Sequence, residues 1–272
     1  MAAPKRLTSA QNPLVLRVRK AVQRGSLTDD GLAIAESVHL LEEALRSGCA
    51  VPFVLASDAA LSTVSRMVAG LHDTSVFGLS PELFRQVAST ESSQGVVALV
   101  KPPAWTLDQA LHGRHPLTVV LDGVQDPGNA GTIVRAAEAF GASGVLFLKG
   151  SVNPYNPKCL RAAAGSAFRL PMISGLEPEL ALAALAQKKA TLYAAMPRTG
   201  ILLPDAEFNI AAAILVGAEG RGVRDELARK ALDLRIPTSG VESLNVAVAT
   251  AVILYEASRQ RTTKNLSTEP RP

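Results

Sequence analysis

Cysteine and aromatic residues are scarce in this chain of 272 residues. Its two cysteines, Cys49 and Cys159, are too few and too far apart for a disulfide framework, which favours a reducing compartment. No basic-then-apolar segment opens the chain, so we expect a cytoplasmic protein. Aromatic residues make up 4% of the chain, which argues against extensive stacking on single-stranded bases.

Long apolar runs and clustered metal ligands are also missing. The longest apolar run, 246–255, has about half of the roughly 20 residues that a membrane-spanning helix needs, so we expect no membrane contact. His112 and His115 have no cysteine or carboxylate partners at ligand spacing, and we expect no metal. Gly165-Ser166 lacks the nucleophile-elbow pattern, so a serine hydrolase is not indicated.

The chain has enough apolar residues to form a core, and it carries a net basic charge. Hydrophobic residues make up 47% of the chain, enough for one large domain or two modest ones, and the net charge of +4 suits an anionic partner. A helix starting at Asn12-Pro13 would place Arg17, Lys20 and Arg24 on one face. That face either follows the phosphates of a nucleic acid or is an ordinary solvated helix face.

The first part of the chain alternates between helix and strand patterns. Helices are expected at 36–46, 62–71 and 81–87, and strands at 53–56, 76–79 and 96–100. This alternation predicts a small α/β sandwich over residues 1–105. Proline and glycine then break the pattern, so 106–115 is predicted to be a linker.

The second part repeats the alternation with more apolar strands. These are expected at 117–121, 145–148, 192–195, 214–216 and 234–236, with helices between them at 133–140, 179–188 and 224–231. Continuous apolar strands predict an α/β domain over 116–261 whose mostly parallel sheet is covered on both faces. The ligand site of such a sheet lies beyond the carboxyl ends of its strands. Frayed or disordered ends are expected at 1–10 and 262–272.

Unusual chemistry follows the strand at 117–121. The residues DGVQDPGNAG, from Asp122 to Gly131, precede a helix in a tight backbone whose N–H groups form a natural cradle for an anion or ligand. Asn129 either caps this helix or has a catalytic role. Arg135 lies among small apolar neighbours, which argues against a merely solvated charge.

A second loop, ILVGAEGRG at 214–222, surrounds Glu219 with glycines. Gly217 and Gly220 allow another backbone or a flat ligand to approach closely, although taken alone a glycine turn is the simpler interpretation. The spacing fits neither a Walker loop nor the dinucleotide fingerprint, so a nucleotide-binding oxidoreductase is disfavoured.

The third loop, IPTSGVESLNVAVATAVILYE at 236–256, leaves a strand at Pro237 and enters a helix. Leu244, Val248, Val252 and Tyr255 recur at helical spacing, and we expect this helix to be buried on most of its surface. Its polar start, with Glu242, Ser243 and Asn245, then requires partners, because unpaired polar groups are costly to bury.

Together and in this order, the three loops resemble the three motifs of the SpoU (TrmH-like) branch of the SPOUT RNA methyltransferases. The matching segments are DGVQDPGNAGTIVRAAEAFGA at 122–142, ILVGAEGRGV at 214–223 and IPTSGVESLNVAVATAVILYEA at 236–257, and the resemblance covers 117–261, including AAAGSAFRLP at 162–171. The amino-terminal segments AESVHLLEEALRSG and TESSQGVVALV are similar to the L30e-like substrate-binding domain often fused to these enzymes.

The resemblance implies a carboxyl-terminal SPOUT domain with a trefoil knot, which dimerises beside its active site. It implies S-adenosylmethionine as cofactor, held largely by backbone groups near Gly217, Gly220, Ile236 and Leu244. It also implies methyl transfer to a ribose 2′-hydroxyl in structured RNA, recognised by shape and phosphate contacts. Thr238 and Ala247 depart from the common family pattern, which bears on packing more than on activity.

By motif match, Arg135 is the family's catalytic arginine, often proposed as the base. Because arginine stays protonated, stabilising the developing alkoxide or binding a phosphate fits its chemistry better. Asn129, Glu219, Ser243 and Asn245 match the remaining functional positions and would orient the ribose, the arginine and the loops.

The L30e-like half favours ribosomal RNA, with 23S RNA first, over tRNA. Three alternatives remain: a tRNA 2′-O-methyltransferase, a ribosomal RNA methyltransferase that confers drug resistance, and a ribosome-assembly protein that binds RNA without catalysis. The joint presence of Arg135, Glu219, Ser243 and Asn245 argues against the last of these.

Overall fold

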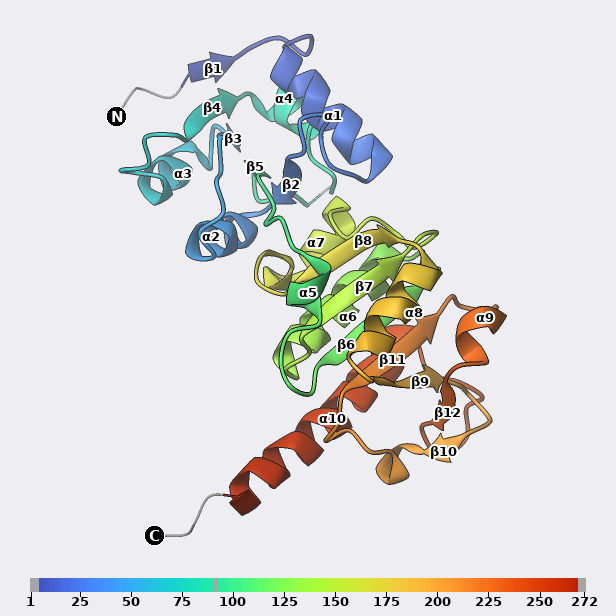
Figure 1. Cartoon of the computed structure of the whole chain (residues 1–272). Helices are drawn as coiled ribbons and strands as arrows, with labels where there is room; N and C mark the ends of the chain where they lie inside the picture. Colours follow the sequence, from blue (N-terminus) through green and yellow to red (C-terminus); the bar gives the residue numbers. More distant parts are fainter. Residues whose placement is uncertain (1–4, 91, 269–272) are drawn as a thin grey trace. The chain divides into compact units, whose positions relative to one another are not determined.

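The computed structural model describes residues 5–90 and 92–268, with side chains up to residue 263. The chain forms two compact units, each built around one β-sheet (Figure 1). The first unit comprises Met1–Ala104 and Tyr155–Arg169, and the second Trp105–Pro154 and Leu170–Pro272. The segment 155–169, from the second half of the sequence, therefore belongs to the first unit.

The sheet of the first unit has five strands in the order β1-β4-β3-β5-β2. They are β1 (Lys5–Leu7), β2 (Ala33–Glu36), β3 (Phe53–Ser57), β4 (Ser75–Leu79) and β5 (Val96–Val100), with β5 antiparallel to both β3 and β2. Its helices are α1 (Pro13–Arg24), α2 (Val38–Arg46), α3 (Leu61–Met67), α4 (Pro81–Arg85) and α7 (Pro157–Ala163). Val15, Val18 and Phe84 pack on the sheet residues Leu55 and Leu99, so α1 and α4 share one core. The predicted α/β sandwich is confirmed.

Pairing between strands corrects two boundaries in this unit. Glu36, predicted as the start of a helix, ends β2 because it pairs with Val97 of β5, and α2 begins only after Ser37, whose hydroxyl accepts from the Leu40 N–H at 3.1 Å. Residues 5–7, predicted to be frayed, form β1 because they pair with β4. Residues 1–4 of that predicted tail lie outside the described residues.

The segment 155–169 is held to the rest of the first unit by ion pairs with buried carboxylates. Glu36 accepts hydrogen bonds from the Ser89 N–H at 2.8 Å and the Thr90 hydroxyl at 3.0 Å, and Arg161 lies 3.5 Å away. Glu43 pairs with Arg169 in the same way. Buried carboxylates are stable only when they are paired, so these contacts hold the segment in place.

The sheet of the second unit has seven strands, in the order β10-β12-β9-β11-β6-β7-β8, and every neighbouring pair is parallel. The strands are β6 (Leu117–Asp122), β7 (Gly144–Leu148), β8 (Met172–Leu176), β9 (Thr191–Ala195), β10 (Ile201–Leu202), β11 (Ala212–Gly217) and β12 (Leu232–Arg235). The prediction of a mostly parallel sheet is confirmed. The edge strands β8 and β10 were not predicted, because neither has a continuous apolar run.

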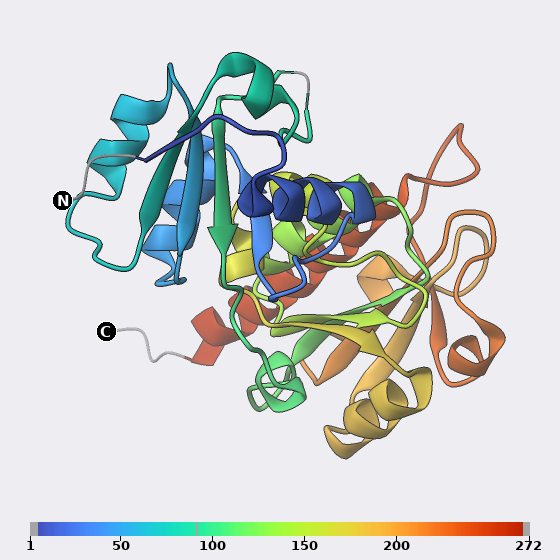
Figure 2. The same ribbon diagram turned by 90° about the horizontal axis from the view of Figure 1, so that it is seen from above.

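Helices cover both faces of this sheet. They are α5 (Leu107–Ala110), α6 (Pro127–Ala139), α8 (Pro178–Gln187), α9 (Asp225–Ala228) and α10 (Val246–Thr268). Helices α5, α8 and α9 pack in one core, and α6 and α10 lie together on the opposite face (Figures 1 and 2). No helix within the described residues is long and apolar enough to cross a membrane.

Two segments predicted to lack structure contain helix. The segment 106–115 carries α5, which a capping box closes: the Gln109 side chain accepts from the Thr106 N–H at 2.8 Å, and the Thr106 hydroxyl accepts from the Gln109 N–H at 3.3 Å. Helix α10 continues to Thr268, because extending an existing helix needs no apolar periodicity. Residues 269–272 of the predicted tail lie outside the described residues.

Helix α10 is buried on one side only. Ala247, Thr250, Ile253, Leu254 and Ala257 are buried, whereas the exposed fractions of Val248, Val252 and Tyr255 are 50%, 37% and 57%. Within a single chain, the prediction that most of this helix is buried is therefore wrong. Val248, Val252 and Tyr255 form an exposed apolar stripe.

The far half of α10 is anchored by Arg261. Its guanidinium donates to the carbonyl oxygens of His115, Phe208 and Ile210 at 2.7–2.8 Å, and burial lowers the pKa of this side chain. These bonds tie the helix to the segments that begin β6 and precede β11.

We predict that Arg261→Ala lowers the free energy of unfolding by roughly 2–4 kcal/mol, since it leaves three carbonyl oxygens without their donor. Urea unfolding of the full chain measures this loss. The matched control is Arg229→Ala on α9, whose pair with Asp225 is 3.9 Å long, is exposed on both sides and should contribute nothing measurable. A loss no larger than that of the control would contradict the prediction.

Candidate active site

A pocket of about 660 Å³ lies where the carboxyl ends of β9, β11 and β12 meet the start of α10. Its lining includes Ala195, Val216, Gly217, Leu234, Ile236, Leu244 and Ile253, together with the loops 218–222 and 242–245. The position is the one expected for a ligand of a parallel sheet. All four residues predicted to surround the cofactor, Gly217, Gly220, Ile236 and Leu244, line this pocket.

The loop after β11 folds tightly back on itself. The Gly222 N–H donates to the Ala218 carbonyl at 2.8 Å, and a Cβ on Gly217 would lie 2.0 Å from the Gly222 carbonyl carbon. Only glycine fits at position 217, since no side-chain atom can occupy that space. Gly220 has a φ of +85°, a left-handed conformation that glycine adopts without strain. The turn presents Glu219 at its exposed tip.

A chain of hydrogen bonds joins the three loops. The Asn129 Nδ2 donates to Glu219 Oε1 at 2.9 Å, and the Asn245 Nδ2 donates to Asn129 Oδ1 at 3.1 Å. The partners are 90 and 116 positions apart in the sequence. The fold thus brings three of the predicted site residues into direct contact beside the pocket.

Helix capping explains why Asn129 is available for this network. Helix α6 begins at Pro127, and the carboxylate of Asp126 caps it by accepting from the Asn129 N–H at 2.8 Å. Of the two roles left open by the sequence, the capping role therefore belongs to Asp126. Asn245 does cap its own helix: its Oδ1 accepts from the Ala247 N–H at 2.9 Å while its Nδ2 reaches Asn129.

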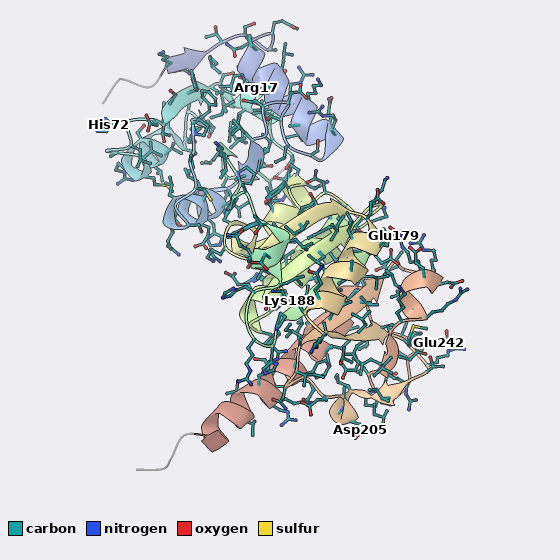
Figure 3. The ribbon with its side chains drawn as sticks, in the orientation of Figure 1. Arg17, His72, Glu179, Lys188, Asp205 and Glu242 are labelled. Carbon is teal, nitrogen blue, oxygen red and sulfur yellow. The ribbon has the colours of Figure 1, made fainter. Side chains whose placement is uncertain are left out.

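The polar residues of the third loop that precede α10 line the pocket. Ser243 is exposed and lines the pocket next to Leu244. Glu242, labelled in Figure 3, pairs with Arg198 at 2.8 Å, and both side chains are largely exposed. The polar residues before α10 thus find their partners in other loops of the same unit and in solvent.

Arg135 stands apart from the hydrogen-bonded network. It lies on α6 beyond Asn129, its side chain is exposed, and it does not line the pocket. In the part of the chain that the structure describes, its guanidinium has no hydrogen-bond or ion-pair partner. An unpaired cation on this helix is free to meet an anion from outside the chain.

An ion pair that the sequence did not reveal lies beneath the second loop. Asp122, fully buried at the end of β6, accepts from the Arg224 N–H at 2.7 Å and from its Nε at 2.6 Å. The hydrogen bond to Asp122 raises the pKa of Arg224. The available signal was an acid ending a continuous apolar strand, where a buried charge demands a partner.

The basic face of α1 belongs to the first unit. Arg17, labelled in Figure 3, pairs with Asp30 at 2.8 Å, while Lys20 and Arg24 pair with Asp29 at 2.8 and 2.9 Å. The hydrogen bond from Lys20 lowers the pKa of Asp29 most, and the hydrogen bond from Arg24 lowers it further. All three cations therefore share a helix face that an acidic turn partly neutralises. No group of three or more potential metal ligands occurs within the described residues.

Each part of the chain matches a known protein family. Residues 116–255 match the SpoU rRNA Methylase family, and residues 12–98 match the MRM3-like substrate binding domain. The 23S rRNA (guanosine(2553)-2'-O)-methyltransferase RlmP of Bacillus subtilis is 32% identical over 253 residues, covering 92% of this chain and 98% of that protein. The 23S rRNA (guanosine-2'-O-)-methyltransferase RlmB of Ralstonia nicotianae is 38% identical over 187 residues, covering 66% and 75%.

Solved structures are also similar to this chain. The SpoU methyltransferase AviRb from Streptomyces viridochromogenes, in complex with AdoMet, superposes with a TM-score of 0.83 at 26% identity and covers 93% of this chain and 99% of its own. The AdoMet-bound rRNA methyltransferase from Sinorhizobium meliloti reaches 0.82 at 27% identity, covering 94% and 98%. Together with the three loops around one pocket, these matches show that the chain belongs to the SpoU rRNA methylase family.

Proposed function

We propose that this protein transfers a methyl group from S-adenosylmethionine to a ribose 2′-hydroxyl of ribosomal RNA, with 23S RNA as the substrate. The observation that carries the proposal is the network of Glu219, Asn129 and Asn245 beside the pocket. The similarity to enzymes named as 23S rRNA 2'-O-methyltransferases supports the choice of RNA. The scarcity of cysteine supports placing the reaction in the cytoplasm.

The residues of the pocket suit this cofactor. The volume of about 660 Å³ lies within the usual range for small-molecule sites, and small or apolar residues such as Ala195, Val216 and Ile253 form its walls. Among the described residues, the main chain of 238–244 makes no backbone–backbone hydrogen bond. Apart from the Val241 carbonyl, which accepts from the Thr238 hydroxyl at 3.3 Å, its N–H and C=O groups are available to a ligand. Gly217, Gly220, Ile236 and Leu244 would hold the cofactor, which supplies an activated methyl group when bound.

The trefoil knot implied by the resemblance is part of this proposal. The loop 218–222 lines the same pocket as residues 236, 238 and 242–245, although the two come from different parts of the chain. We propose that these segments form the knot.

The reaction requires a hydroxyl to be positioned and deprotonated. Holding reactants in line supplies up to roughly 7–11 kcal/mol, and a general base contributes about 10²–10⁴ in rate. In this proposal Glu219, Asn129 and Asn245 orient the loops around the ribose, and Ser243, which lines the pocket, contacts the ribose. Arg135 stays charged, so it stabilises the developing alkoxide or binds the adjacent phosphate.

We predict that Arg135→Ala lowers kcat for methyl transfer by about 100-fold or more, while the Kd for S-adenosylmethionine changes by no more than about twofold. The assay measures transfer of labelled methyl to ribosomal RNA, and calorimetry measures cofactor binding. Arg229→Ala is the control, because it removes an exposed arginine from α9.

Wild-type transfer rates in Arg135→Ala would contradict the role of Arg135. Mapping 2′-O-methyl groups in ribosomal and transfer RNA, with and without the gene, identifies the substrate. An unchanged map together with a ribosome-assembly defect would instead favour a non-catalytic role.

We further propose that a second copy of this chain covers the apolar stripe of α10. Val248, Val252 and Tyr255 are exposed there, and the Tyr255 ring packs edge-on against Phe140, which follows α6, at 5.8 Å between centroids. Helices α6 and α10 thus form one surface with an exposed apolar centre, which a monomer rarely leaves uncovered.

We predict that Val252→Asp shifts the protein from dimer to monomer, because a charge cannot be buried unpaired at the centre of the contact. Sedimentation velocity measures the mass. Leu180→Asp, which changes an exposed leucine on α8, should leave the dimer intact. A monomeric wild type, or a dimeric Val252→Asp variant, would refute this contact.

Arg17, Lys20 and Arg24 are our proposed RNA-binding residues. Their pairs with Asp29 and Asp30 are exposed, and exposed pairs contribute at most about 1 kcal/mol, so RNA phosphates can displace the carboxylates. Arg17 also lies 5.8 Å from the centre of the Phe53 ring, which gives it a packing role as well.

We therefore predict that the double variant Lys20→Ala/Arg24→Ala weakens RNA binding and flattens the slope of log K against log salt by roughly 1 to 2. Filter binding over a range of salt concentrations measures both effects. Arg66→Ala/Arg85→Ala removes the same charge from other exposed sites of the first unit and is the control. Equal slopes for the two double variants would show that the α1 face does not contact phosphate.

A further inference from the structure

We infer that Asp122 is a positioning residue for the reaction, acting on Glu219 through its ion pair with Arg224. The inference rests on the proposed function, because it concerns the same site. Asp122 does not itself line the pocket, and it makes no hydrogen bond to Glu219, Asn129 or Asn245. Its effect on the site must therefore pass through the loop that follows β11.

Both oxygens of the Asp122 carboxylate are engaged. Oδ2 accepts from the Arg224 main-chain N–H at 2.7 Å, and Oδ1 accepts from Arg224 Nε at 2.6 Å and lies 2.5 Å from its terminal nitrogen. Asp122 is fully buried, and the Arg224 side chain is 26% exposed. This pair holds the backbone as well as the side chain of Arg224 in a defined place.

The contacts of Asp122 fix both ends of the Glu219 loop. Gly217, before the loop, is the register partner of Asp122 in the β11–β6 ladder, and Arg224, after the loop, is bound by the carboxylate. The guanidinium of Arg224 also donates to the Lys149 carbonyl at 3.2 Å, beyond the end of β7. The loop is thereby attached to the ends of two neighbouring strands.

Glu219 depends on this attachment because its own surroundings hold it weakly. It is exposed, and its carboxylate accepts a hydrogen bond from the Asn129 side chain. Hydrogen bonds at exposed positions contribute little by themselves, so the position of the carboxylate is set by the backbone of residues 218–222. Releasing one end of that turn would move Glu219 relative to Asn129, and a displacement of about 1 Å can cost roughly 10² in rate.

Arg221 provides a second cation near the same carboxylate. Its guanidinium lies 3.9 Å from Asp122 Oδ1, is 61% exposed, and lines the pocket. Neutralising Asp122 therefore removes the counter-charge that Arg221 and Arg224 share, and Arg224 keeps its longer pair with Glu226 at 3.5 Å. The repulsion between the two arginines adds to the loss of the hydrogen bonds and displaces the loop further.

The test is Asp122→Asn, which keeps the shape of the side chain and removes its charge. Methyl transfer is measured at saturating cofactor and normalised to cofactor-binding sites, so that unfolded protein does not count. We expect kcat per site to fall roughly 10- to 100-fold while KM for RNA stays within about threefold. Arg224→Lys, which keeps the charge and loses the forked hydrogen bonds, should give an intermediate loss.

A double-mutant cycle separates positioning from mere stability. If Asp122 acts through Glu219, Asp122→Asn should cost less than about threefold in a Glu219→Ala background. Glu36→Gln, which neutralises a buried carboxylate in the first unit, is the matched control and should lower Tm without changing kcat per site.

The outcomes distinguish this inference from the proposed function. An inactive wild type would defeat the proposed function itself. An active wild type combined with a wild-type kcat in Asp122→Asn, or with fully additive losses in the cycle, would overturn the positioning role. Should Asp122→Asn fail to fold, Arg224→Lys carries the same comparison with Glu219→Ala.

Discussion

The carboxyl ends of parallel strands must lie at one edge of their sheet, and the site of this protein depends on that constraint. Strands β6, β9, β11 and β12 end together, so the loops that follow them meet although they are far apart in the sequence. The apolar strands keep this edge in place because both faces of the sheet are covered by helices. Chemistry can then be carried by the loops while the sheet provides stability.

The loops are held by a few polar contacts at their bases rather than by many at their tips. Asp122 binds Arg224, Asp126 caps α6 and Asn245 caps α10, each with distances typical of strong hydrogen bonds. The functional groups themselves remain exposed or half-buried, as substrate access requires. This division lets exposed side chains such as Glu219 keep a defined position although each of their own bonds contributes little.

Local signals in the sequence predicted the fold class, and the resemblance of three motifs to a known family implied the residues around the pocket. Apolar periodicity indicates strands and helices, and glycines at fixed spacing indicate close backbone approach. Predictions failed where a partner far along the chain decides the local structure. Strands β1 and β2 form because they pair with β4 and β5, and their own residues give little sign of it.

The same limit applies within the site. The sequence left Asn129 with two possible roles, and the structure gives the capping role to Asp126 at the start of α6. The spacing of Val248, Val252 and Tyr255 indicated a helix correctly. Burial on most of its surface was predicted because the run is apolar nearly all round, yet these three residues are exposed. Arg135 was identified by its motif, yet its separation from the network appears only in three dimensions.

The sequence by itself determined that three loops of a methyltransferase family are present, in order, behind apolar parallel strands. Only the tertiary structure decided which side chains meet: Glu219 with Asn129, Asn129 with Asn245, and Asp122 with Arg224. The physical reason is range. Periodicity and capping act over a few residues, whereas a hydrogen bond between residues about 100 positions apart exists only once the sheet has brought its strand ends together.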